Sequence, residues 1–340
     1  MPKTLVTGAN GFVAASIIDA LILQYGHTVT GSVRTLSKGE QIIATHPEYA
    51  GKLDFVVVSD YAKEGTWDKT FQEGNFDYVI HTAAPLLDNL ENTDFVKHYL
   101  EPSVHGATEL LKSAKAYGKS VKAIVVTGSC NAMTTGMDVD SRVFSSDSWL
   151  PVTIDDAIKA QHPYISYCVA KAESEKAIWK FVKEEKPVFS VTNLLPCLIF
   201  GPPLQPVQSL KKINYSNDVF YSLFNGTYEV TPDTSFPSYI DVRDLATAHI
   251  LSLTTPAVFN QRLAVGGAQY SSQLAVDSLK KVPEVASRLP KDGSEVPKKF
   301  VITDVEKWNE ALGLKLRTAE ETFGDAARKI LELEKILGGK

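Results

Sequence analysis

The sequence has little of what marks secreted, membrane-bound or metal-dependent proteins. Its three cysteines, Cys130, Cys168 and Cys197, are too few and too scattered for a disulfide framework or a zinc site. No window approaches the ~18 uninterrupted apolar residues that a membrane-spanning helix needs. A strand pattern begins almost at Met1, which leaves no room for a signal peptide. We therefore expect a cytoplasmic protein with no resident metal and no membrane anchor.

A strongly basic surface is also missing. The 340 residues carry a formal net charge of −5, and the sequence pI is about 5.9, so we expect no nucleic-acid partner. The content of 44% hydrophobic and 22% charged residues is that of an ordinary folded globular protein. The length suggests roughly two structural units.

Apolar runs alternate with helical stretches in the first half of the chain. The runs are rich in Val, Ile and Phe and mostly continuous, which is typical of strands buried on both faces of a parallel sheet. They cover residues 4–7, 28–33, 53–58, 76–81, 121–127 and 189–195. Helices are predicted over 12–25, 95–117 and 167–183. This alternation predicts an α/β fold, a Rossmann-type doubly wound parallel sheet.

The character of the chain changes after Leu195. Four prolines within 196–208 predict that this stretch has no regular element. We expect residues 1–195 to form the nucleotide-binding core, with a long polar insertion at 136–163. Residues 196–340 are expected to form mainly a smaller substrate-binding lobe, from which about 239–266 return to the core.

A glycine-rich turn joins the first strand to the first helix. Gly8 permits a tight turn, and Gly11 lets the backbone approach a pyrophosphate, while amides at the helix start face the anion. Ala14 is small enough for close helix–strand packing. The predicted cofactor-binding residues of this turn are Gly8, Ala9, Asn10, Gly11, Phe12 and Val13. The turn predicts a dinucleotide site.

The second strand indicates which dinucleotide. Sites that prefer NAD place an acidic residue about 20 residues beyond the glycines, but no acid lies between His27 and Gly39. Arg34 instead ends this strand, and Lys38 follows. A guanidinium fork and a mobile ammonium suit a 2′-phosphate, so we predict NADPH.

Other strand ends are expected at the same edge of the sheet, where ligands bind in open α/β folds. Asp60, with Tyr61 beside it, follows the third strand and can accept from an adenine amino group. The small residues after the fourth strand would let the cofactor pass, although a packing role for the two alanines is equally open. These residues are Thr82, Ala83 and Ala84, and Thr127 ends the fifth strand.

Three side chains form a candidate catalytic group. Ser129 follows the fifth strand, and Tyr167 and Lys171 are four residues apart, so they share one face of a helix. Tyr167 can give a proton to the oxygen of a carbonyl that receives a hydride, and Ser129 can stabilise the charge on that oxygen. We expect the Lys171 ammonium to stabilise the phenolate and thereby make Tyr167 a better acid. Lys171 can also hold the nicotinamide ribose.

These residues, with the segments at 6–13, 31–34, 81–85 and 239–244, resemble the extended short-chain dehydrogenase/reductase family. The likeness is to its fungal carbonyl reductases related to methylglyoxal reductase, and more distantly to plant dihydroflavonol and cinnamoyl-CoA reductases. It implies NADPH-dependent reduction of aldehydes and ketones, α-dicarbonyls included, with Ser129, Tyr167 and Lys171 as the triad. It also implies that the loop from Pro196 to Ile199 and Ser216 contact the cofactor.

The sequence departs from this family in two places. Thr127-Gly128-Ser129-Cys130 replaces the more usual Thr-Ser-Ser followed by an aromatic residue, which leaves substrate identity open. The predicted substrate wall is Cys130, Asn131, Met133, Thr134 and Leu198. The Asn-Val-x-Gly-Thr helix signature of wider members reads Ser103-Val-His-Gly-Ala, and no catalytic Asn is assigned.

Two other functions use the same core. A sugar-nucleotide epimerase or dehydratase would need a polar, basic second lobe, whereas residues 195–237 are apolar, aromatic and proline-rich. A non-enzymatic NADPH sensor would have no use for the Ser–Tyr–Lys set. We expect a small carbonyl compound as substrate and a monomer or homodimer as the assembly.

Overall fold

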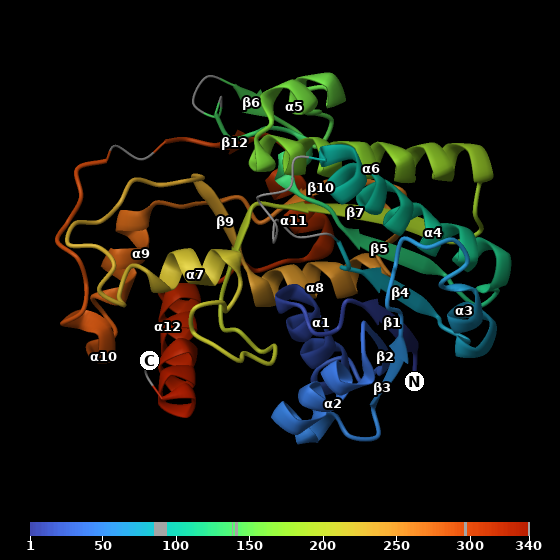
Figure 1. Cartoon of the computed structure of the whole chain (residues 1–340), viewed down its shortest axis with the longest axis horizontal. Coiled ribbons are helices and arrows are strands. Elements are labelled where there is room, and N and C mark those ends of the chain that lie inside the picture. The colour runs from blue at the N-terminus through green and yellow to red at the C-terminus, as the bar shows by residue number, and fades with distance from the viewer. Residues whose placement is uncertain (85–93, 138, 140–141, 296–297, 339–340) are drawn as a thin grey trace.

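The computed structural model describes residues 1–84, 94–137, 139, 142–295 and 298–338 (Figure 1). Its main sheet has seven parallel strands in the order β10-β7-β5-β4-β1-β2-β3. These are β1 Lys3–Thr7, β2 Thr28–Val33, β3 Leu53–Val57, β4 Tyr78–His81, β5 Ala123–Thr127, β7 Ser190–Pro196 and β10 Arg262–Val265. The predicted doubly wound parallel sheet is confirmed, and each predicted strand of the first half is present with bounds shifted by at most two residues.

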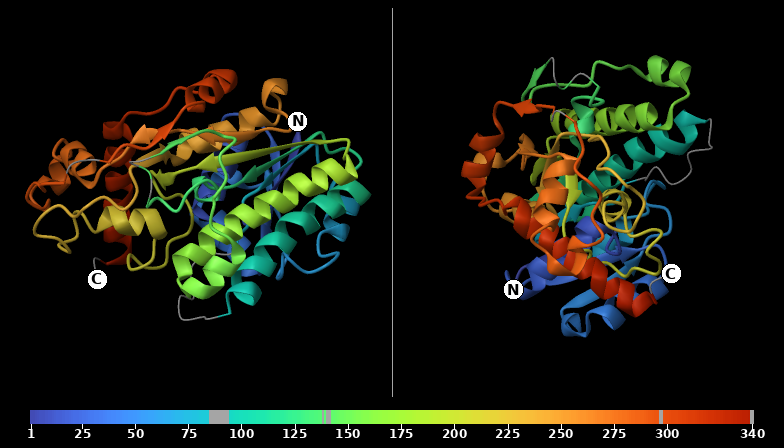
Figure 2. Two further views of the ribbon diagram at one scale, coloured as in Figure 1. Left: turned by 90° about the horizontal axis from the view of Figure 1, so that it is seen from above. Right: turned by 90° about the vertical axis from the view of Figure 1, so that its left-hand side faces the viewer.

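Helices cover both faces of this sheet because neighbouring strand residues point to opposite sides. On β1, Leu5 packs in the cluster under α4 and α6, and Val6 packs in the cluster under α1. Figure 2 shows α4 and α6 side by side along one face. The bounds are α1 Phe12–Leu23, α2 Leu36–Thr45, α3 Asp68–Gly74, α4 Glu101–Tyr117, α6 Pro163–Glu185, α8 Val242–Ser252 and α11 Val305–Leu312. Within the described residues, no helix is long and apolar enough to cross a membrane.

A second group of elements gathers at the left of Figure 1. It contains a three-stranded sheet in the order β11-β9-β8 and an aromatic core in which Phe200, Tyr270 and Phe323 meet. Its elements are β8 Leu198–Phe200, α7 Tyr215–Tyr221, β9 Ser238–Asp241, β11 Ala268–Gln269, α9 Ser272–Leu279, α10 Pro283–Ala286 and α12 Ala319–Leu337. β10 pairs with β7, and α8 packs on α1, so part of 239–266 lies in the core sheet and on its face.

Two sequence-based expectations need correction. Residues 196–208 are not wholly irregular, because β8 lies between the prolines and pairs in parallel with β9. The insertion at 136–163 is not only a polar loop. It contains β6 Val143–Phe144 and α5 Ile154–Ala160, and β6 pairs with β12 Val301–Ile302 from far along the chain. The sequence gives no local signal of this pairing, because a strand of two residues is too short to show the alternation of apolar and polar residues that marks a strand.

In the described part of the chain, four short helical turns, three of the 3-10 type and one π-helical, join the longer elements. They are η1 Pro47–Tyr49, the π-turn η2 Val96–Leu100, η3 Cys130–Ala132 and η4 Pro256–Val258. The π-turn runs directly into α4, so the helix predicted over 95–117 is one continuous helical stretch. Helix α6 begins at Pro163, four residues before the predicted start, since proline is favoured in a first helical turn.

A buried ion pair ties the edge strand β10 to α6. Arg262 Nε donates to Glu175 Oε1 at 2.7 Å, and the two side chains are only 9% and 2% exposed. The guanidinium also donates to the Ser146 and Ser148 carbonyls and lies 4.0 Å from the Trp149 ring centroid. Arg262 therefore holds the insertion as well as the sheet edge.

Replacing this arginine should destabilise the protein strongly. Arg262→Met would leave the Glu175 carboxylate buried without its partner, so we expect the free energy of unfolding to fall by about 3–5 kcal/mol in chemical denaturation. Lys329→Met, which removes one partner of the exposed Lys329–Glu332 pair, is the control and should cost less than about 1 kcal/mol. Equal losses for the two variants would contradict the role of Arg262.

Candidate active site

The site lies where the strand order reverses, between β1 and β4, at the carboxyl ends of the strands. Thr7, the last residue of β1, links the two ends. Its Oγ1 accepts from the amides of Thr82 at 3.1 Å and Ala83 at 3.0 Å, and it bonds His81 Nδ1 at 2.8 Å. The chain after β4 is therefore fixed beside the glycine turn.

The glycine turn fits closely against this chain. Gly8 has a φ of +69°, and a Cβ there would lie 3.3 Å from Ala83 Cα. Gly11 is the N-cap of α1 and offers no capping side chain, and the first turn of α1 has no acidic residue. The amides at the start of α1, from Phe12 and Val13 onward, thus have no side-chain cap, as a phosphate-binding helix start requires.

Three of the four predicted adenosine-end residues lie near one another. Arg34 is exposed, and within the described chain no ion pair or hydrogen bond of its guanidinium is found, whereas Lys38 donates to Gln41 Oε1 at 3.4 Å. Asp60 is exposed and accepts from the Ala62 amide. Burial raises the pKa of Tyr61. The charge of Asp60 raises this pKa further and the charge of Arg34 lowers it, so the three side chains are neighbours.

Ser129 is held by the short turn that follows it. Its Oγ accepts from the Asn131 amide at 3.1 Å and lies 3.2 Å from Asn131 Oδ1. Asn131 Nδ2 in turn donates to the Tyr164 hydroxyl at 2.8 Å. Asn131, predicted as a substrate contact, therefore also orients Ser129, and the sequence carried no signal of this role.

Tyr167 lies beside both Lys171 and Ser129. Lys171 Nζ lies 5.6 Å from the Tyr167 ring centroid, and hydrogen bonding with Ser129 lowers the pKa of Tyr167. Burial dominates, however, so the net pKa of Tyr167 is raised, with Cys130 and Cys168 contributing. The stabilisation of the Tyr167 phenolate by Lys171 stays a prediction.

Lys171 itself is affected by the same burial. Loss of hydration lowers its pKa to about 8, well below the ordinary value of a lysine.

Two residues upstream of Ser129, Thr127 Oγ1 bonds His249 Nε2 at 2.7 Å. This histidine, from α8, was missed in the sequence because nothing local links it to β5.

The loop from Pro196 to Ile199, which is predicted to face the nicotinamide, is also held in place by neighbouring elements. Pro196 ends β7, and the Ser216 hydroxyl donates to the Ile199 carbonyl in β8. Ser216 is buried, so part of its role is to hold this loop. Tyr215 beside it is exposed, yet it raises the pKa of Tyr167 electrostatically, which places it near the Tyr167 phenol.

The predicted substrate wall is only partly exposed. Met133 and Thr134 are completely buried and Cys130 nearly so, because η3 turns them toward the packed interior. Asn131 and Leu198 are partly exposed. The wall of Cys130, Asn131, Met133, Thr134 and Leu198 stays a prediction, in which Asn131 and Leu198 are the two members with exposed surface.

The fold and site together define a dinucleotide-binding protein of the doubly wound class, with a Ser–Tyr–Lys group beside the cofactor edge. The chain belongs to the NAD dependent epimerase/dehydratase family, whose model matches residues 4–266.

Relatives cover nearly the whole chain. It is 33% identical to the NADPH-dependent methylglyoxal reductase GRE2 of Saccharomyces cerevisiae (98% of this chain, 99% of the relative) and 32% identical to the ketoreductase azaE of Aspergillus niger (97% and 98%). The solved yeast methylglyoxal/isovaleraldehyde reductase Gre2 complexed with NADPH has a TM-score of 0.85 at 32% identity, covering 98% and 99%. The predicted resemblance to the fungal reductases is confirmed. A UDP-glucuronic acid 4-epimerase from Bacillus cereus, 18% identical with a TM-score of 0.71, shares the fold.

The charge state of Lys171 can be measured directly. We expect its ammonium to lose its proton with a midpoint near pH 8, because burial disfavours the charged form. The measurement is a 13C NMR titration of the unliganded protein labelled at lysine Cε, with the signal assigned by its loss in Lys171→Arg. A Lys171 midpoint near about 10.4, the value of an unburied lysine, would contradict the burial argument.

Proposed function

We propose that this chain is an NADPH-dependent reductase that converts aldehydes and ketones, α-dicarbonyls included, to alcohols. The observation that carries the proposal is the convergence of Ser129, Tyr167 and Lys171 beside the ends of β4 and β5. The names of the Saccharomyces and Aspergillus relatives support carbonyl reduction.

The residues present fit NADPH. Gly8 forms a cradle that a Cβ would fill, and the start of α1 lacks a capping side chain, so both suit a pyrophosphate. Arg34 and Lys38 suit a 2′-phosphate, while Asp60 and Tyr61 lie at the adenine end. Structures of the Saccharomyces and Candida relatives in complex with NADPH support this assignment.

The proposed reaction divides the work among the three side chains. Bound NADPH supplies the hydride that reduces the carbonyl carbon. As the carbonyl electron pair moves onto oxygen, Ser129 donates a hydrogen bond to that oxygen and Tyr167 transfers its phenolic proton to it. The Lys171 ammonium then faces the phenolate left on Tyr167 and stabilises its charge.

The alternatives are less well supported. An epimerase or dehydratase would need polar and basic groups for a nucleoside diphosphate, whereas the core of the second lobe is built from aromatic rings such as Phe200, Phe220 and Tyr270. An NADPH sensor would not need the ordered Ser129. The cytoplasmic location, the absence of a metal or nucleic-acid partner, the domain division and the monomeric or homodimeric state stay predictions.

Removing the proton donor should stop the reaction. Tyr167→Phe should lower kcat for methylglyoxal or isovaleraldehyde by about 100- to 10,000-fold. NADPH binding, measured by fluorescence titration, should stay nearly unchanged. Tyr164→Phe, one helical turn earlier, is the matched control and should lose less than about tenfold, because its hydroxyl bonds the supporting side chains of Asn131 and Cys168. Full activity of Tyr167→Phe would mean that another group is the acid.

Arg34 should discriminate between the two cofactors. Arg34→Ala should weaken NADPH binding by about 1.5–3 kcal/mol, the worth of a hydrogen bond to a charged group, and leave NADH binding almost unchanged. Binding of both cofactors is measured by isothermal titration calorimetry, with Arg328→Ala on the surface of α12 as the control. An equal loss for NADPH and NADH would rule out the 2′-phosphate contact.

A further inference from the structure

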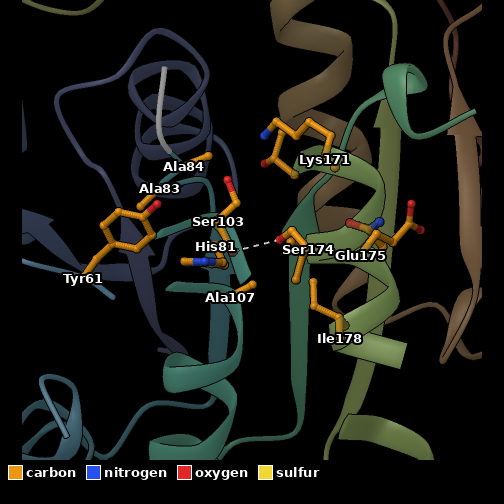
Figure 3. Close-up of a pocket in the computed structure, with 14 residues that line it drawn as sticks. Tyr61, His81, Ala83, Ala84, Ser103, Ala107, Lys171, Ser174, Glu175 and Ile178 are labelled. Carbon is orange, nitrogen blue, oxygen red and sulfur yellow. Dashed lines mark hydrogen bonds between the residues drawn. The ribbon is translucent and has the colours of Figure 1, made fainter. Parts of the chain in front are cut away.

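A small cavity lies behind the catalytic lysine, between helices α4 and α6 and the ends of the core strands (Figure 3). It measures about 30 Å³, which is room for the centres of one or two water molecules. Its polar lining comes from five elements. The residues that matter here are His81, Ser103, Thr127, Lys171, Glu175 and Asn193.

Asn193, from the middle of β7, is the most unusual group in this lining. It is completely buried, and neither its Nδ2 nor its Oδ1 has a hydrogen-bond partner among the described residues. A buried polar group left unpaired costs about 1–3 kcal/mol, so the amide requires an explanation. Gly128 makes room for it, because a Cβ at that position would lie 2.8 Å from both amide atoms. Within the described part of the chain the amide thus has space but no hydrogen-bond partner.

The tautomer of His81 follows from its neighbours. Thr7 Oγ1 already accepts from the amides of Thr82 and Ala83, so its own proton goes to His81 Nδ1. The proton of the neutral ring is then on Nε2. Burial, followed by the charge of Lys171, lowers the pKa of His81 to about 4 and keeps the ring neutral. His81 therefore brings an N–H donor to the cavity lining.

Thr127 is part of the lining, but its hydroxyl bonds a side chain of α8 and is not counted among the polar groups of the cavity. His249 Nδ1 lies 2.8 Å from the Leu245 carbonyl, which can only accept, so Nδ1 carries the proton. His249 Nε2 then accepts the Thr127 hydroxyl proton. Donors from Lys171 and His81 and both capacities of Asn193 form a set that water can satisfy.

We propose that Asn193 is a positioning residue for the reaction: its amide holds water in this cavity, and that water hydrates the ammonium of Lys171 from behind. The role in the reaction rests on the proposed function, whereas the water site does not. Titratable groups around Lys171 are Tyr167 and Glu175 on α6, His81 at the end of β4 and Tyr61 after β3. The Glu175 carboxylate is paired with Arg262, and α4, β5 and β7 contribute only uncharged residues to the lining.

The water site is tested on the wild-type protein. A crystal structure of the NADPH complex at high resolution should show an ordered water bonded to the Asn193 amide and linked to Lys171 Nζ. The same crystals of Asn193→Leu should lack this water, since Leu has a similar volume but no polar atom. A dry cavity in the wild-type protein would overturn the proposal on its own, even if the leucine variant does not fold.

The effect on Lys171 is tested by the 13C titration of the unliganded protein. Asn193→Leu should lower the Lys171 midpoint by about one pH unit, because removing water disfavours the charged form. Thr192→Val is the matched control, since it removes a neighbouring buried hydroxyl that bonds the Val258 carbonyl instead of facing the cavity. A midpoint that stays at the wild-type value in Asn193→Leu, or that moves equally in Thr192→Val, would overturn the proposal.

A kinetic measurement separates this inference from the proposed function. In Asn193→Leu the alkaline fall of kcat should move to lower pH by the same amount, while the Kd for NADPH stays constant. A wild-type protein that reduces no carbonyl compound would defeat the proposed function but leave the crystallographic and NMR tests valid. An active wild-type enzyme whose alkaline limb is unmoved by Asn193→Leu would defeat only the positioning role.

Discussion

The site depends on keeping an ammonium group charged where the protein excludes most water. Lys171 must lie close to the Tyr167 ring to stabilise a phenolate, yet that position places its side chain between α4, α6 and the strand ends. Burial lowers the pKa of Lys171 to about 8 and raises that of Tyr167. Each shift favours the neutral form of its group, so both oppose the charges that develop in the reaction. Polar groups behind the lysine offset this penalty without adding a second charge.

Neutral histidines fix the hydroxyl groups around this lysine. His81 and His249 are both buried, and desolvation lowers the pKa of each to about 4. Each ring therefore keeps a single tautomer over the physiological range and sets the direction of one threonine hydroxyl, Thr7 or Thr127. A neutral imidazole orients these hydroxyls without repelling the ammonium of Lys171. A carboxylate in the same place would instead form an ion pair with that ammonium and immobilise it.

The parts of the site that depend on local sequence were predictable. The glycine turn, the hydroxyl after β5 and the four-residue spacing of Tyr167 and Lys171 each follow from how a strand or helix presents its side chains. The groups that support them were not, because Asn193 and His249 reach the site only through strand order and helix packing. A polar Asn inside the apolar run 189–195 was the one available signal. The burial of Met133 could not be predicted, because it depends on the direction of a three-residue turn.

Ion pairs fix the second group of elements to the core sheet, and this attachment limits the places where a substrate can be selected. Arg317 donates to the buried Asp244 of α8, and Arg243 pairs with both Asp241 and Asp325, so α12 is tied to the core sheet's own helix. The lobe's aromatic core is closed, since Phe200, Phe220 and Phe323 pack against one another. We therefore expect a substrate to contact the surface near Tyr167 and not the interior of this lobe. The segments expected to form that surface are the turn after Ser129 and the segment from Leu198 to Tyr215, and differences between such reductases in the carbonyl compounds they accept should follow from side chains at these two places.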